Sequence, residues 1–178
     1  MSGLIAFVRA VERVNDLVGR AVALLTLGTV LVCFATVYSR YALNTNFIWL
    51  QEAYVWQHAL VIVLGGAYTM MVGGFVRVDI LYGRMSPRGR AKVDIIGTLV
   101  FLMPFLAVLA WAFWRFFWNG YLADEGSPNE GGLPNWWLLQ GALVVFVALT
   151  FLQGCALVAR SLLVLGGREE FAPKLSHG

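Results

Sequence analysis

The sequence predicts an all-α integral membrane protein with four transmembrane helices. Of its 178 residues, 60% are hydrophobic and 13% are charged, and the mean hydropathy is +0.74. Soluble proteins have about 45–50% apolar and about 25% charged residues. Long apolar segments alternate with short polar ones. The period-two pattern of barrel strands is absent, so these segments must satisfy their backbone hydrogen bonds as helices.

Four segments have the length of a membrane span. They cover roughly residues 17–38, 53–73, 93–118 and 136–165. A helix rises about 1.5 Å per residue, so about 20 apolar residues cross roughly 30 Å of hydrocarbon. We therefore expect residues 1–178 to form a single four-helix membrane domain.

The first twenty residues carry acidic side chains and three arginines, Arg9, Arg13 and Arg20. They lack the short apolar core and small-residue cleavage site of a signal peptide. We interpret them as a retained cytoplasmic lead-in.

The connection 39–52 mixes amide and charged residues with Phe47, Ile48 and Trp49. This mixture predicts a short interfacial helix, or a turn, between spans one and two. Trp49 fits the aromatic belt at a membrane surface. Arg40 and Glu52 are close enough in sequence to form an ion pair across the connection.

The segment between spans two and three holds the densest group of cations, with only two acidic residues among them: Arg77, Arg84, Arg88, Arg90 and Lys92, against Asp79 and Asp94. Cations near span ends are retained in the cytoplasm. The arginines before span one and the cations after span four lie on the same side, whereas residues 119–135 are acidic. Both termini are therefore expected in the cytoplasm. Arg84, Arg88, Arg90 and Lys92 should bind anionic lipid headgroups, and cations that flank apolar segments do not indicate nucleic acid.

The third span contains Pro104, which predicts a bend because proline lacks a backbone N–H. Asp94 and Arg115 lie near its two ends and should reach the membrane surfaces. In the loop before the fourth span, Asn135 is a candidate N-cap.

Polar residues inside spans are functional candidates because they are expensive in hydrocarbon. We interpret His58, in span two, as a hydrogen-bonded histidine in helix packing. The other reading is a haem ligand or proton relay, and the alternative function is then a membrane anchor of a redox complex, with His58 as one haem ligand. The other histidine, His177, is in the tail, so this chain does not supply both ligands of a bis-histidine haem. No catalytic, metal or substrate-binding residues are predicted, and neither an enzyme nor a cofactor is expected.

Gly66 and Ala67 give span two a small-residue face, which allows close approach of another helix. That helix belongs either to the same bundle or to a second membrane protein. Because four spans with few internal polar groups enclose a solute path poorly, we favour the second membrane protein and place Gly66 at an expected subunit interface. The lack of a polar stripe also disfavours an autonomous channel.

Four stretches resemble a known family: "NFIWLQE" at 46–52, "LGGAYTMMVGGFVRVDILYGRMSPRGRAKVD" at 64–94, "GGLPNWW" at 131–137 and "FLQG" at 151–154. Together they are similar to the small membrane (Q-type) subunit of tripartite ATP-independent periplasmic (TRAP) transporters. The details of "LQE", "SP" and "GGLPNWW" resemble the branch associated with 2-oxo acids, mannitol or chloroaromatic compounds. One position departs from the family, since Phe75 stands where members commonly have histidine.

The resemblance implies a multi-pass protein of the bacterial inner membrane that works in a sodium-coupled transporter of organic acids. Its partners would be a large, elevator-type membrane subunit and a periplasmic substrate-binding protein, and the small subunit would act as a scaffold. The candidate interface or anchoring residues are then Arg40, Trp49, Glu52, Gly66, Arg77 and Asp79.

The charge distribution makes the topology testable. A cysteine introduced at Ser127 should react with a membrane-impermeant reagent added outside the cell, and a cysteine at Ser86 should not. The reverse labelling pattern would contradict cytoplasmic termini.

Overall fold

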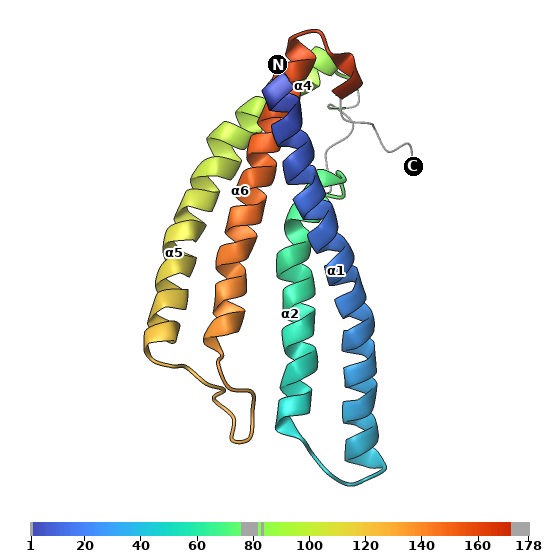
Figure 1. The fold of residues 1–178 in the computed structure, drawn as a ribbon, viewed down its shortest axis with the longest axis vertical. Coiled ribbons are helices and arrows are strands. Elements are labelled where there is room, and N and C mark those ends of the chain that lie inside the picture. The colour runs from blue at the N-terminus through green and yellow to red at the C-terminus, as the bar shows by residue number, and fades with distance from the viewer. Residues whose placement is uncertain (1, 76–81, 83, 172–178) are drawn as a thin grey trace.

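The structure is a computed structural model that describes residues 2–75, 82 and 84–171, and this part of the chain contains helices and no strands (Figure 1). The long helices are α1 (Ser2–Tyr41), α2 (Ile48–Met71), α5 (Met103–Leu122) and α6 (Trp137–Leu165). The shorter elements are α4 (Pro87–Gly97), the π-helical turn η1 (Thr98–Leu102) and the 3₁₀ turn η2 (Glu169–Phe171).

The long helices lie side by side in one layer, in the order α5, α6, α2, α1 (Figure 1). α6 contacts α1, α2, α4 and α5, and it carries more buried residues than any other helix. The start of α1 and the end of α6 lie beside α4, at what we term the α4 end. The connections 42–47 and 123–136 lie at the opposite end, which we term the loop end.

Within the described residues, three helices are long and apolar enough to cross a membrane: α1, the continuous helix Pro87–Leu122, and α6. The chain is therefore a multi-pass membrane protein. α2 is not one of these three helices. Its 24 residues span about 36 Å, but Gln57 and His58 lower the hydropathy of its first half.

α1 is much longer than the predicted first span. Its 40 residues extend about 60 Å, roughly twice the hydrocarbon thickness. The lead-in is helical, and Val8, Val11 and Asn15 recur at helical spacing as buried residues. Through this face the first turns of α1 pack against α6, so the lead-in is part of the bundle.

The structure does not form the separate interfacial helix expected between spans one and two. Residues 42–47 are non-helical, and Ile48 begins α2 itself. Asn44 has a positive φ of 52°, and the Thr45 backbone N–H donates to the Ser39 carbonyl at 3.0 Å. This tight turn reverses the chain, which leaves the apolar residues after it as the first turn of α2.

The third long helix begins six residues before the predicted span. Ser86 caps it by accepting a hydrogen bond from the Gly89 backbone N–H at 3.2 Å, and Pro87 occupies its first turn. The turn η1 comes just before Pro104, and the Met103 N–H bonds the Thr98 carbonyl five residues back. A wider turn relieves the conflict between a proline ring and the preceding turn. The structure thus has a local π-turn beside Pro104, and the predicted bend stays a prediction.

Glycines set the closest approaches between helices. A Cβ on Gly19 would overlap the Tyr68 ring of α2, and a Cβ on Gly154 would lie 3.0 Å from the Met103 methyl group. Small residues allow such contacts between membrane helices. The packing of α1 on α2 and of α5 on α6 therefore depends on these glycines.

Replacing Gly19 with alanine should separate α1 from α2 and lower the melting temperature of the detergent-solubilised protein by several degrees. About 1 kcal/mol corresponds to roughly 2–4 °C for a chain of this size. Gly97→Ala is the matched control, because a Cβ there meets nothing within 4 Å. Equal melting temperatures for the two variants would contradict a close contact between Gly19 and Tyr68.

Candidate functional site

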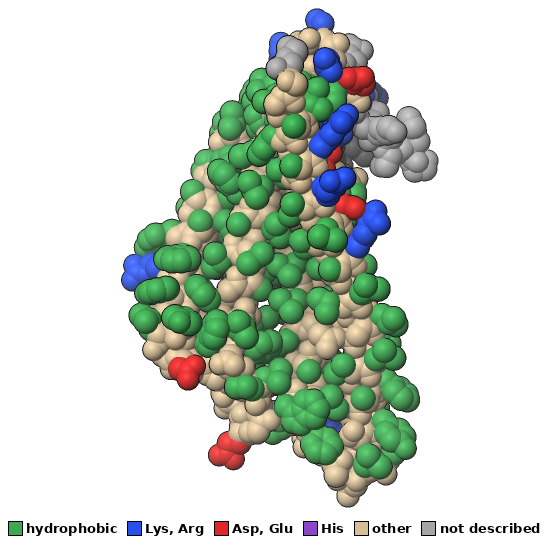
Figure 2. Space-filling model, in the orientation of Figure 1, with side chains coloured by type: hydrophobic (Ala, Val, Ile, Leu, Met, Phe, Trp, Pro, Cys, Tyr) green, Lys and Arg blue, Asp and Glu red, His purple; other side chains and the backbone are tan. Residues whose placement is uncertain are grey.

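Charged side chains gather at the two ends of the bundle. Lys and Arg side chains dominate the α4 end, and acidic side chains lie near the loop end (Figure 2). The acidic residues of the second connection are Asp124, Glu125 and Glu130. Between the two ends, Asn15 and Glu12 of α1 contact Gln153 and Arg160 of α6, whereas the hydroxyls of Thr29, Thr36 and Thr69 donate to carbonyls of their own helices.

Glu52 is the centre of a polar cluster at the loop end. It is 7% exposed, although it carries a carboxylate. Its oxygens accept hydrogen bonds from the Ser127 hydroxyl, the Asn129 side-chain amide at 2.9 Å and the Leu133 backbone N–H at 2.7 Å. Three donors favour the ionised carboxylate. Glu52 therefore fastens the connection 123–136 to the first turn of α2.

The loop is shaped around this carboxylate. A Cβ on Gly132 would lie 2.6 Å from the Glu52 Oε2 atom, so glycine is required for the close approach. The Ser127 hydroxyl accepts from the Asn129 backbone N–H at 3.0 Å, and the Ser127 backbone N–H donates to the Leu133 carbonyl at 3.2 Å. Glu52 and the loop thus form one hydrogen-bonded unit.

The expected ion pair between Arg40 and Glu52 is wrong. The Arg40 Nη2 atom donates to the side-chain oxygens of Asn46 at 3.1 Å and Gln51 at 3.5 Å. Arg40 therefore closes the turn between α1 and α2. The loop donors already satisfy the carboxylate, and the sequence separation of more than 70 residues hid them from a local search for partners.

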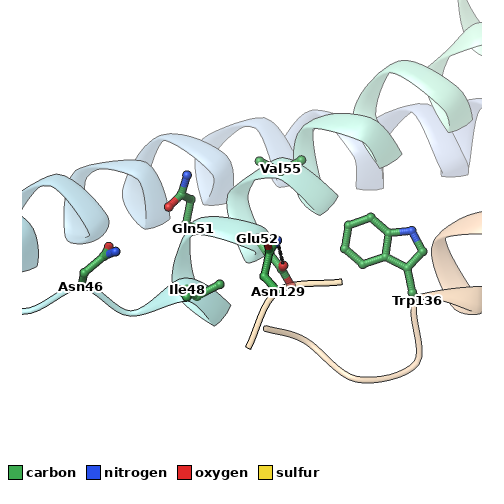
Figure 3. A pocket seen from close by; sticks show the side chains of 7 residues that line it. All are labelled: Asn46, Ile48, Gln51, Glu52, Val55, Asn129 and Trp136. Atoms are coloured by element: carbon green, nitrogen blue, oxygen red, sulfur yellow. Dashed lines mark hydrogen bonds between the residues drawn. The ribbon is translucent and has the colours of Figure 1, made fainter. Parts of the chain in front are cut away.

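An open cleft of about 360 Å³ adjoins the cluster at the loop end (Figure 3). It is lined by Asn46, Ile48, Gln51, Glu52, Val55, Asn129 and Trp136. The Trp136 ring meets the Trp56 ring edge-on, with centroids 5.7 Å apart. The lining combines amide groups, one carboxylate and apolar side chains.

Two further predicted interface residues have different surroundings. Trp49 is about half exposed beside Phe47, with ring centroids 6.2 Å apart. Gly66 faces α6, because a Cβ there would lie 2.8 Å from the Phe146 ring, and Ala67 is fully buried. The space beside this small-residue face is therefore occupied by α6 of the same chain.

At the α4 end, Arg84, Arg88 and Lys92 are exposed. Arg90 instead donates from Nε to the Tyr82 carbonyl at 3.1 Å, and the Tyr82 hydroxyl donates to Asp94 at 2.8 Å. This contact folds the chain back onto the start of α4. Arg77 and Asp79 lie outside the described residues.

The sequence did not predict which residues form the polar contact between α1 and α6. The Asn15 side-chain amide donates to the Gln153 Oε1 atom at 2.7 Å, and both side chains are buried. Further along the same helix pair, Arg160 and Glu12 form an ion pair at 3.0 Å. A single polar residue on an apolar helix face indicates that a polar partner exists. It does not indicate which residue, and here the partners are more than 130 residues away in the sequence.

The described residues contain no group of three or more His, Cys, Asp and Glu side chains that could hold a metal ion. His58 is exposed on α2. The observed polar chemistry consists of hydrogen bonds that hold helices and a loop together.

Comparison with known proteins identifies one family. The model described as "Tripartite ATP-independent periplasmic transporters, DctQ component" matches residues 29–163. Neither the curated proteins nor the solved structures gave a significant match.

The geometry around Glu52 predicts that Glu52→Gln releases the loop. The amide would present a donor to groups that are themselves donors, and a hydrogen bond to a charged group contributes about 1.5–3 kcal/mol. Hydrogen exchange at the Leu133 amide should then accelerate by about 10- to 100-fold, measured by mass spectrometry on the loop peptide.

The matched control is Glu130→Gln, which removes an exposed carboxylate from the same loop. It should leave exchange at Leu133 unchanged. Slow exchange in the Glu52 variant would show that the carboxylate does not hold the loop.

Proposed function

Because the chain belongs to the DctQ component family of tripartite ATP-independent periplasmic (TRAP) transporters, we propose that it is the small permease subunit of a sodium-coupled secondary transporter for organic acids. The family match over residues 29–163 is the observation that carries this proposal. Its partners are a large membrane subunit and a periplasmic substrate-binding protein. The resemblance of "LQE" and "GGLPNWW" to one branch favours 2-oxo acids, mannitol or chloroaromatic compounds as its substrates.

The small subunit acts as a scaffold for the large, mobile subunit. The polar contacts inside the chain support this role, since Asn15 joins two helices and Glu52 holds a loop. These side chains are occupied by structural partners within the chain. Substrate and sodium are therefore assigned to the large subunit.

In the cell, the protein is a single four-span domain of the bacterial inner membrane with both termini in the cytoplasm. α2 packs between α1 and α6, which are both apolar enough to cross, so α2 crosses with them as the fourth span. The exposed cations at the α4 end, Arg84, Arg88 and Lys92, bind lipid headgroups on the cytoplasmic side. Since Ser127 and Ser86 make structural hydrogen bonds, exposed Glu130 and Met85 are better positions for the labelling test.

The alternative of a haem-bearing anchor has no support from the family, which is one of transporter components. It predicts a Soret band that shifts on reduction in the purified complex. A transporter subunit predicts no such band.

Glu52→Gln provides the functional test. If the loop supports assembly without contacting substrate, the variant should lower maximal uptake or recovery of the complex. The change leaves the buried donors of the loop without a charged acceptor, and a hydrogen bond to a charged group contributes about 1.5–3 kcal/mol. The substrate concentration for half-maximal uptake should stay the same, because other subunits set it.

Uptake is measured in proteoliposomes containing the complete three-part system, with Glu130→Gln as the matched control. A large change in the half-maximal concentration with normal assembly would show that this subunit contacts the substrate. That result would contradict the scaffold role.

A further inference from the structure

His58 is a polar side chain exposed on the middle of α2. It lies ten residues after Ile48, or about 15 Å along the helix axis. It forms no hydrogen bond with another described residue. An imidazole is too short to reach either membrane surface from this depth, so hydrocarbon would leave its N–H and ring nitrogen unsatisfied.

His58 belongs to an outward stripe on α2, formed by Gln51, Val55, His58 and Ile62. These residues recur every three or four positions, so they share one side of the helix. Gln51 and His58 are exposed, and Val55 and Ile62 are 46% and 63% exposed. The sides next to this stripe are occupied within the chain. Gln57 approaches Gly28 of α1, and Trp56 contacts Trp136.

The exposed faces of the other helices differ from this stripe. On α1, the exposed Thr26 hydroxyl donates to the Val22 carbonyl of its own helix at 3.5 Å. On α5, Arg115 lies over the Trp111 ring and is seven residues from the end of the helix, so its long side chain can extend to the headgroups. Among the exposed polar groups on these three helices, His58 therefore has the strongest need for a partner.

One more observation agrees with a protein partner on this stripe. The cleft at the loop end continues the stripe, because Gln51 and Val55 line both.

We propose that the stripe Gln51, Val55, His58 and Ile62 is the surface on which the large membrane subunit docks. His58 hydrogen-bonds a polar group on a helix of that subunit, and a side chain from the same helix enters the cleft. This inference rests on the proposed function and adds which face of the chain forms the joint. α1 and α5 then face lipid.

Substitutions on the stripe are compared with substitutions on the lipid-facing surfaces of α1 and α5 for their effect on recovery of the large subunit. The affinity-tagged large subunit is co-expressed with each variant and purified in mild detergent, and recovery is divided by the abundance of the variant in the membrane. Ile62→Trp and His58→Leu should lower the recovered fraction by about tenfold, which corresponds to roughly 1.4 kcal/mol. His58→Gln keeps hydrogen-bonding capacity and should retain more complex than His58→Leu.

The matched controls are Val108→Trp on α5 and Leu24→Trp on α1, which are 64% and 73% exposed. Both should leave recovery unchanged, because a lipid-facing site accommodates a larger side chain. A photo-cross-linking residue at position 62 should join the large subunit, and one at position 108 should not.

Normal recovery of both α2 variants would overturn the proposal, whether or not a control variant loses the partner. Cross-linking from position 108 but not from position 62 would overturn it as well. If the unmodified chain fails to co-purify with the large subunit, the proposed function itself fails, and the docking surface fails with it.

Discussion

Helices that are apolar on every side gain little by leaving lipid for one another, because lipid tails are as apolar as leucine. This constraint leaves steric fit and a few buried hydrogen bonds to hold the bundle together. The structure supplies both along α6. Gly154 admits the π-turn of the third helix, Phe146 fills the space beside Gly66, and Gln153 pairs with Asn15. The arrangement of the whole layer depends on these contacts.

The carboxylate of Glu52 solves a related problem at the loop end. An irregular loop has backbone N–H groups that helices would satisfy internally, and near a membrane they need partners. Glu52 provides an acceptor from α2, and its own burial is compensated by the donors of the loop. The loop and the second helix are therefore positioned by the same group.

The apolar segments predicted the long helices well, because span length and hydropathy are local properties. The fourth segment, 136–165, nearly matches α6, and the all-helical class is confirmed. The lead-in was harder to interpret, since its charges mask the buried face of Val8, Val11 and Asn15. Asn135 also differs from its expected role. It has a positive φ of 60° and makes no cap, because the chain must turn sharply before Trp136.

Residue types pointed to the site, but its partners could not be predicted. Glu52 was a candidate because it ends the family-like stretch "NFIWLQE" and because Arg40 lies close to it in sequence. Its true partners are on a loop more than 70 residues away, and a glycine and a backbone N–H are among the groups that shape the contact. Pairing across such distances depends on helix packing, which a single sequence does not specify. Nearby Arg40 was therefore a reasonable but incorrect partner.

The position of α6 in the layer has a consequence for how the protein is made. α1 and α2 contact one another directly, so the first two helices can pair as soon as both have left the ribosome. α5 makes its main interhelical contacts with α6, which is the last long helix in the chain. Until α6 is synthesised, the bundle consists of a helical pair and a separate third helix. Assembly is thus completed from the middle of the layer by the final helix to enter the membrane.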